Sequence, residues 1–362
     1  MSSVSVDSLI PRLDDDYRLM IVDVREPDEF AEWHIPGALN IPLGQLASRL
    51  DEIPSDRHVV TVCALGVRAL EGAKILADAG VAPEVLSGGM AAWGQAYECV
   101  EAHIEGATVI QVRRRGKGCL SYVVGAGERA VVIDPSADID RYIELAHRRS
   151  FTITHVFDTH LHADHLSGAR DLVAATGAEL LLNPADPFRF DYTALSDGLR
   201  VEISDNLHLT VAAVSAPGHT EGSTIYRLGE GALFTGDTLF LESVGRPDLA
   251  EQAEAYAHLL YRSLHNVVLP LDDSILVMPA HYGESVQVRH GELVARRLGE
   301  LRATLPALAY DEETFVNWAI EHVTDRPPNY QEIVKFNAGV SERTMGDLVE
   351  LELGPNRCAI AS

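Results

Sequence analysis

The stretch Thr159-His160-Leu161-His162-Ala163-Asp164-His165 decides the architecture of the larger part of this chain. It follows an apolar run, 153–157, that predicts a buried strand, and it precedes a helix-like stretch, 170–175. Histidine and aspartate are seldom buried without partners, so packing explains three imidazoles and a carboxylate in one turn poorly. Neutral imidazole is the commonest metal ligand among side chains. The stretch therefore predicts the rim of a metal site at the C-terminal end of a strand.

Three further ligand-type residues stand at the ends of later apolar runs, each in a loop tightened by glycine or proline. They are His219 after 207–214, Asp237 after 232–234 and His281 after 274–277. One histidine at a strand end is usually a surface or hydrogen-bonded residue, so the recurrence of the pattern carries the signal. We expect these side chains to join those of the histidine-rich turn.

The composition excludes several classes of function. The 54 acidic residues against 29 basic ones give a formal charge of −25, which repels nucleic acid and anionic membrane surfaces. No apolar run is long enough to span a bilayer, and residues 1–7 lack the features of a secretory signal. The four cysteines are widely scattered, which favours a reducing, cytoplasmic setting. They are Cys63, Cys99, Cys119 and Cys358.

The length of 362 residues suggests two or three domains. Up to about residue 100, strand-like runs alternate with helical stretches, which predicts a small α/β domain with a parallel sheet. The stretch 98–106 is short and polar, and we expect the domain boundary there. The prediction is a first domain over 1–100 and a second over 107–362, in which strand-like runs dominate at first.

Cys63 is the chemical centre of the first domain. It stands between a strand-like run, 58–62, and a helical stretch, 69–79, where loop amides and a helix dipole stabilise a thiolate. Gly66 permits a tight loop, and Arg68 adds a positive charge for an anionic substrate. A small buried thiol without chemical function is the alternative for a cysteine considered alone.

The motifs around Cys63 identify the first domain as a member of the rhodanese (sulfurtransferase) family. They are Asp23-Val24-Arg25-Glu26-Pro27-Asp28-Glu29-Phe30, the loop 34–43, Cys63-x-x-Gly-x-Arg68 and Gly88-Gly89-Met90-x-x-Trp93. The resemblance implies that Cys63 carries a persulfide sulfur, which the loop amides and Arg68 stabilise. The chain departs from the family at Trp33, where glycine is usual, and at Ala69, where serine is common. Ala64 and Leu65 also make the loop apolar.

The ligand-type residues of the second domain, in their order and context, resemble the metallo-β-lactamase superfamily. That resemblance covers about 108–282 and implies an αββα sandwich with metal between the sheets. Two arrangements use the same residue types. Two zinc ions with Asp237 bridging are similar to the site of glyoxalase II-like thioesterases. One Fe(II) on His160, His219 and Asp237 is the facial triad of non-heme iron oxygenases.

Four motifs favour iron because they resemble persulfide dioxygenases. They are Asp237-Thr238-Leu239-Phe240, Gly245-Arg246-Pro247-Asp248-Leu249, Pro327-Pro328-Asn329-Tyr330 and Gly354-Pro355-Asn356-Arg357-Cys358-Ala359. The resemblance implies one Fe(II) per chain, and oxidation of glutathione persulfide by O2 to sulfite and thiol. Arg246 would contact the carboxylate of the thiol carrier, and Tyr282 is a weaker substrate-binding candidate. The remaining ligand-type residues would hold waters, orient the ligands or bind a second metal. These are His162, Asp164, His165 and His281.

The two resemblances together predict a rhodanese and persulfide dioxygenase fusion. Cys63 would pass sulfur between thiosulfate or sulfite and a thiol, and sulfite is the product of the iron site. Dimerisation is a family expectation. Two alternatives stay open: a binuclear zinc thioester hydrolase, and a persulfide carrier or sensor that works through Cys63 with a structural metal.

Overall fold

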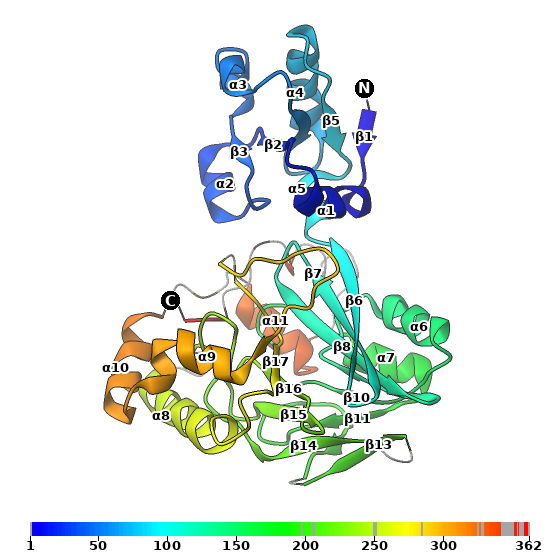
Figure 1. Ribbon diagram of the computed structural model, residues 1–362, viewed down its shortest axis with the longest axis vertical. Helices are drawn as coiled ribbons and strands as arrows, with labels where there is room; N and C mark the ends of the chain where they lie inside the picture. The colour runs from blue at the N-terminus through cyan, green and yellow to red at the C-terminus, as the bar shows by residue number, and fades with distance from the viewer. Residues whose placement is uncertain are drawn as a thin grey trace.

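The computed structural model describes residues 2–196, 198–204, 207–248, 252–283, 285–323, 326, 329–341, 351–352, 354 and 358–360, without the side chains of 207–214. The chain forms two bodies stacked along the longest axis, with the N-terminal one at the top of Figure 1. In the described part of the chain, no helix combines the length and apolar character needed to cross a bilayer.

The upper body is a five-stranded parallel sheet in the order β1-β5-β4-β2-β3 with helices around it. Its strands are β1 (Ser2–Val4), β2 (Leu19–Asp23), β3 (Leu39–Asn40), β4 (His58–Val62) and β5 (Glu84–Leu86). Its helices are α1 (Val6–Asp15), α2 (Pro27–Glu32), α3 (Leu43–Leu46), α4 (Val67–Asp78) and α5 (Gly89–Trp93), with a 3₁₀ turn η1 (Leu50–Glu52). Two separate apolar cores form in this body. Strands of a parallel sheet are buried on both faces, which explains their continuous apolar runs. The predicted parallel α/β fold is confirmed.

The expected linker over 98–106 is wrong. This stretch belongs to strand β6 (Tyr97–Ile104), which pairs antiparallel with β7 (Ala107–Arg114) along its whole length. The strand lies at the edge of its sheet, where outward-facing charged residues such as Glu101 are exposed and alternate with buried Val100 and Ile104. Charged residues protect an edge strand from pairing with other chains, and they also give it the composition of a linker.

The lower body is a sandwich of two sheets with helices on its outer faces (Figure 1). The seven-stranded sheet, in the order β12-β11-β10-β9-β8-β7-β6, adds β8 (Cys119–Ala126), β9 (Arg129–Ile133), β10 (Thr152–Phe157), β11 (Glu179–Leu182) and β12 (Thr193–Ala194). The six-stranded sheet comprises β13 (Arg200–Ser204), β14 (Leu207–Ser215), β15 (Thr224–Leu228), β16 (Ala232–Gly236), β17 (Leu276–Pro279) and β18 (Arg296–Arg297) in this order. A large apolar core drawn from both sheets fills the sandwich. The predicted αββα architecture is confirmed.

The helices of the lower body cover its two outer faces. They are α6 (Ile139–Arg148), α7 (Ala169–Thr176), α8 (Ala253–Ser263) continuing into a π-helical turn η2 (Leu264–Val268), α9 (Leu298–Thr304), η3 (Pro306–Ala309), α10 (Glu312–Glu321) and α11 (Tyr330–Asn337). In α6, Tyr142 and Ala146 are one turn apart and both buried, because residues four positions apart share a helix face. A second apolar core forms between the first sheet and α6 and α7. This packing fixes the loops at the end of the sheet that hold the polar cluster.

The two bodies meet through close backbone contacts. The indole Nε1 of Trp33 donates to the carbonyl oxygen of Gly116 at 2.8 Å, and Arg114 Nε donates to that of Gly94 at 2.6 Å. A Cβ added at Gly116 would lie 2.0 Å from the carbonyl oxygen of Trp93, so only glycine fits there. The turn between β7 and β8 is therefore pressed against the end of α5.

Candidate functional site

The histidine-rich turn follows strand β10 and is held in place by side chains from distant segments. The backbone N–H and the hydroxyl of Thr159 donate to the carboxylate of Asp134 at 2.6 to 3.1 Å. The amide of Asn337 in α11 donates to the carbonyl oxygens of His162 and His165 at 2.9 and 2.8 Å. These bonds satisfy the turn's polar backbone in the interior and aim its side chains inward.

Three of the predicted residues bring their ligand-type atoms together in a closed space. Asp237 Oδ2 lies 3.5 Å from His160 Nε2 and 3.4 Å from His219 Nε2. All three residues are at most 2% exposed. None of these three atoms has a hydrogen-bond partner among the described residues. Buried polar atoms without partners are rare in folded proteins, so the convergence of three of them indicates a ligand between them.

The second ring nitrogen of each triad histidine is anchored, which decides where the lone pairs point. His219 Nδ1 lies 3.0 Å from the carbonyl oxygen of Arg246, which can only accept, so Nδ1 carries the proton. His160 Nδ1 lies 2.9 Å from the hydroxyl of Thr159, whose own proton is donated to Asp134. In its neutral form, each ring therefore presents the lone pair of Nε2 to Asp237, which is the tautomer that binds a metal.

The electrostatics of the triad also favour a cation. Burial lowers the pKa of His219 to about 4, so its imidazole is neutral near pH 7. Burial acts to raise the pKa of Asp237, but His281 and His160 outweigh it and hold that pKa well below its usual value. Two imidazoles and an ionised carboxylate form a donor set that suits Fe(II) or Zn²⁺.

A chain of contacts extends from the back of Asp237. His281 Nδ1 lies 2.6 Å from Asp237 Oδ1, and its Nε2 lies 2.7 Å from Asp164 Oδ2. Asp164 Oδ1 in turn lies 3.2 Å from His165 Nδ1. Burial opposes a charge on His281, but Asp164 and Asp237 outweigh it and raise its pKa well above the usual value. This series of contacts can fix the orientation of Asp237 through His281.

His162 lies apart from the triad although its ring centroid is 4.2 Å from that of His160. Its Nε2 lies 3.0 Å from Asp134 Oδ1 and 3.9 Å from Asp158 Oδ1. Its ligand-type atoms group with these two carboxylates and not with the atoms of the triad. Asp134 therefore contacts both His162 and Thr159, and Thr159 is the residue that orients the ring of His160.

Two cysteines, Cys119 and Cys358, also lie in this cluster, which their positions in the sequence do not predict. Cys119 Sγ is 3.9 Å from Asp164 Oδ2, and its ligand atom groups with those of His165 and His281. Cys358 is buried beside Asp237 and His281, because the backbone of its segment pairs with 244–246. A lone cysteine has no ligand spacing, so the sequence did not predict that either thiol lies beside the cluster. The position of Cys358 depends on the return of the C-terminal segment.

The two predicted substrate-binding residues lie in different surroundings. Arg246 is 1% exposed, and its guanidinium makes two bonds to the carboxylate of Asp248 at 2.7 and 2.9 Å. Tyr282 is partly exposed in a cleft between the two bodies. Of the motifs that favoured iron, residues 249, 327–328 and 355–357 lie outside the described residues.

The site in the upper body is built from one loop. Cys63 is 2% exposed, and its sulfur accepts hydrogen bonds from the N–H groups of Gly66 at 3.1 Å and Ala69 at 3.3 Å. These amides stand at the start of α4, where the helix dipole favours negative charge. Arg68 is engaged elsewhere: it makes two bonds of 2.7 Å to Glu29. The geometry suits a thiolate or a sulfur anion bound to Cys63.

Comparison with protein families agrees with this geometry. The model of the rhodanese-like domain matches residues 5–96, and that of the metallo-beta-lactamase superfamily matches residues 114–281. The chain belongs to both families, as a fusion of the two domains. The rhodanese-like domain carries Cys63, and the metallo-β-lactamase domain carries the triad.

Individual relatives cover part of the chain. The mitochondrial persulfide dioxygenase ETHE1 of Bos taurus is 28% identical over 208 residues, which cover 55% of this chain and 76% of that protein. A hydroxyacylglutathione hydrolase of Methylobacillus flagellatus is 32% identical over 130 residues, which cover 36% of this chain and 51% of that protein. This chain spans only half to 63% of the length of the four hydroxyacylglutathione hydrolases compared.

A solved structure has a similar fold. The crystal structure of ETHE1 from Myxococcus xanthus superposes with a TM-score of 0.57 at 28% identity, covering 65% of this chain and 99% of that one. The superposition therefore covers nearly the whole of that protein.

Proposed function

We propose that this protein is a persulfide dioxygenase coupled to a sulfurtransferase. The reaction consumes a low-molecular-weight thiol persulfide, O2 and water, and gives the thiol and sulfite. Glutathione persulfide is the proposed substrate. The observation that supports this most is the convergence of three buried atoms without partners among the described residues, one from each of His160, His219 and Asp237. The same chain holds Cys63, whose sulfur accepts hydrogen bonds from two backbone N–H groups.

His160, His219 and Asp237 would hold one Fe(II). The fit rests on the two oriented Nε2 lone pairs and on the ionised carboxylate between them. Fe(II) with two imidazoles and one carboxylate supplies activation of O2 and keeps open positions for substrate. Neutral His219 and ionised Asp237 need no change of protonation on binding a cation near pH 7, which favours affinity.

The surrounding residues keep the triad oriented and dry. The carbonyl oxygen of Arg246 fixes the ring of His219, and Thr159 with Asp134 fixes the ring of His160. His281 holds the second oxygen of Asp237 and so directs Oδ2 towards the histidines. The buried cluster excludes water, which protects a reactive persulfide from side reactions.

Cys63 would carry sulfur in the other half of the proposed function. Its two amide contacts stabilise a thiolate, which attacks the outer sulfur of thiosulfate, displaces sulfite and keeps that sulfur as a persulfide. A small thiol then takes the sulfur and frees the thiolate. Because the two domains are joined in one chain, each would release its product from the same molecule that carries the site able to use it.

A hydrolase with two zinc ions is the second candidate. Hydroxyacylglutathione hydrolases are among the relatives, and the ligand atoms of Asp164, His165 and His281 lie close enough to one another for a second metal. Against this, Asp164 and His281 are already bonded to each other, and His162 groups with Asp134 and not with the triad. The first candidate therefore requires fewer rearrangements of the side chains.

An oxygen electrode combined with metal analysis separates the two candidates. The dioxygenase consumes one O2 per glutathione persulfide, contains about one iron per chain and forms sulfite. Two zinc ions per chain, with hydrolysis of a glutathione thioester and no oxygen uptake, would establish the hydrolase instead.

Replacement of the sulfur carrier tests the independence of the two sites. Cys63→Ser should abolish transfer of sulfur from thiosulfate to glutathione, because the serine hydroxyl does not form a persulfide. Oxygen uptake with supplied glutathione persulfide should stay within about twofold of the parent, since distant sites act independently. Loss of that uptake would instead support a protein that works only through Cys63.

A further inference from the structure

The end of the histidine-rich turn is anchored by two side chains from the C-terminal part of the chain. The side-chain oxygen of Asn337 accepts from the N–H of Ser167 at 2.9 Å. The neighbouring N–H, that of Leu166, donates to Oε1 of Glu352 at 2.8 Å. Leu166 is fully buried, and a buried N–H needs an acceptor because leaving it unpaired destabilises the fold. A carboxylate is a stronger acceptor than a neutral group, so Glu352 holds this point of the main chain firmly.

Glu352 also reaches the junction of the two domains. Its other carboxylate oxygen, Oε2, lies 2.9 Å from Nη1 of Arg114 at the end of β7. Nε of the same guanidinium donates to the carbonyl oxygen of Gly94, which directly follows helix α5 of the rhodanese-like domain. Arg114 and Glu352 are only 1% and 5% exposed. One buried carboxylate therefore connects the histidine-rich turn to the arginine that contacts the other domain.

The surroundings of Glu352 fix its position. Burial opposes the charge of Arg114, but nearby groups, Glu352 foremost, outweigh it and raise the pKa of Arg114 above its usual value. The amine of Lys117 adds a contact, because it donates to the backbone carbonyl oxygen of Glu352 at 3.0 Å. Removal of one member of a buried ion pair leaves an uncompensated charge, which destabilises a protein far more than the loss of an exposed pair.

The anchored segment leads directly to the triad. Asp164 and His165 precede Leu166, and Asp164 Oδ2 lies 2.7 Å from Nε2 of His281. Nδ1 of His281 in turn lies 2.6 Å from Oδ1 of Asp237. A shift of the main chain at Leu166 would therefore disturb the contacts that orient Asp237.

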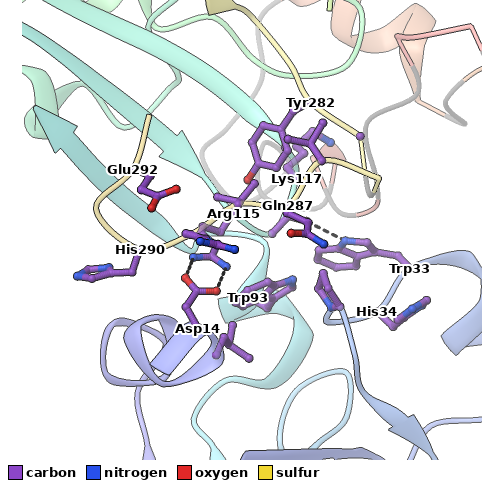
Figure 2. A pocket seen from close by; sticks show the side chains of 18 of the residues that line it. Asp14, Trp33, His34, Trp93, Arg115, Lys117, Tyr282, Gln287, His290 and Glu292 are labelled. Atoms are coloured by element: carbon purple, nitrogen blue, oxygen red, sulfur yellow. Dashed lines mark hydrogen bonds and ion pairs between the residues drawn. The ribbon is translucent and has the colours of Figure 1, made fainter. Parts of the chain in front are cut away.

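A second ion pair across the domain junction lacks this connection. Arg115, the neighbour of Arg114, lies 2.8 Å from Asp14 of α1, as the dashed lines of Figure 2 show. Both members of the pair line a cleft of about 1170 Å³ between the domains. In the described part of the chain, the other ion-pair contact of Arg115 is with Glu98 of strand β6, at 3.4 Å. This pair joins the two domains without reaching the histidine-rich turn.

We infer that Glu352 is a positioning residue of the metal site, which fixes the histidine-rich turn against the domain junction through Leu166 and Arg114. The rhodanese-like domain then supports the geometry of the metal site, in addition to its own chemistry. Glu352 lies outside both family matches, which cover residues 5–96 and 114–281. The inference rests on the proposed function for the presence of a metal on the triad.

The zinc affinity of two graded variants tests this role. Zn²⁺ is the probe because imidazoles and carboxylates bind it and it has no redox chemistry, and a competing chelator gives its dissociation constant. Glu352→Ala removes both side-chain contacts and should weaken zinc binding about tenfold. Glu352→Gln keeps an acceptor for the N–H of Leu166 and should recover part of this loss. Zinc affinity within about twofold of the parent in both variants would overturn the inference.

Denaturant unfolding of the metal-free protein separates positioning from stability. A purely structural role of Glu352 would lower the free energy of unfolding and leave the zinc affinity of the folded protein at the parent's value. A positioning role lowers the zinc affinity even in Glu352→Gln, the variant with the smaller loss of stability.

Arg114→Met tests the link to the domain junction. It leaves the contact between Glu352 and Leu166 in place but removes the ion pair and the bond to Gly94. Zinc affinity should fall about as far as in Glu352→Gln. The double variant of Arg114→Met and Glu352→Gln should lose no more than either single variant, since both changes break the same ion pair. Losses that add up would show that the two residues act separately, which would overturn the inference.

Asp14→Asn is the matched control, because it breaks the other ion pair between the domains by the same change from carboxylate to amide. Its zinc affinity should stay within about twofold of the parent, since distant sites act independently. An equal loss in Asp14→Asn would mean that domain docking in general sets the affinity, and would overturn the specific role of Glu352. Sulfur transfer through Cys63 should persist in the Glu352 variants, which verifies that the rhodanese-like domain is folded.

The parent protein distinguishes this failure from that of the proposed function. If the parent binds no metal on the triad, the proposed function fails and the role of Glu352 fails with it. If the parent binds the metal and consumes oxygen, and the Glu352 variants bind zinc as tightly as the parent, the proposed function stands and only the role of Glu352 fails.

Discussion

The triad of His160, His219 and Asp237 draws its side chains from loops after three different strands, whereas a single loop, 63–69, makes the Cys63 site. The triad uses side-chain atoms that have no partner until a ligand arrives. The Cys63 loop uses backbone N–H groups that already contact sulfur. The first site is therefore incomplete by itself, and the second is complete in the protein alone.

Because of this difference, we expect substitutions to affect the two sites to different degrees. A site of unpaired side chains loses its ligand when one donor is removed, because each atom contributes one bond. A cradle of backbone amides tolerates most side-chain changes around it, because its donors belong to the main chain. We therefore expect the largest loss on removal of a ligand of the triad and the smallest on removal of a surface contact near Cys63.

The largest effect is expected for Asp237→Asn. The change keeps the shape of the side chain but removes the negative charge between the two histidines, so metal affinity and oxygen uptake should fall more than about 100-fold. Metal analysis and the oxygen electrode measure both quantities. Sulfur transfer through Cys63 should be unchanged in the same protein. A joint loss of both activities would mean that the two sites are not independent.

A smaller effect is expected for His281→Ala. Its imidazole holds the second oxygen of Asp237 and contacts Asp164, so its removal should cost about 10- to 100-fold in metal affinity. A metal-binding titration with a chelator as competitor measures the change, and His147→Ala in the last turn of α6 is the control. A fall from two metal ions per chain to one would contradict the single-metal proposal.

The smallest effect is expected for Glu29→Gln in the rhodanese-like domain. The hydrogen bonds from Arg68 lower the pKa of Glu29 to about 2 from its ordinary 4.5. The pair therefore adds stability above pH 4.5, and this stability is lost as the pH falls towards 2. Because both side chains are 35% exposed, the loss at pH 7 should be only about 0.2 to 1 kcal/mol.

Denaturant unfolding of the intact chain checks this value. The difference between the parent and Glu29→Gln should be largest near pH 7 and should shrink below pH 4.5. Glu32→Gln on the same helix is the matched control, since Glu32 is exposed and has no ion-pair partner among the described residues. A difference that grows on acidification would contradict the assigned role of the pair.

The sequence predicted most of the fold because its strands are strongly apolar. The run 58–62 is strand β4 as predicted, and the run from 153 to 157 lies within β10. The prediction was wrong for 98–106, where an edge strand carries charges on its exposed face. Helix α5 ends at Trp93, and Tyr97 already pairs with Arg114 in the sheet of the second domain.

By itself, the sequence determined which residue types were available and which loops carried them. It placed Cys63 before a helix and the histidines after a strand, because both patterns are local. Only the tertiary structure decided that Asp237 stands between His160 and His219, that His162 turns to Asp134, and that Cys358 returns to the cluster. These contacts join residues far apart in the chain, so the packing of two sheets and the docking of two domains fix them. The cleft between the domains arises in the same way.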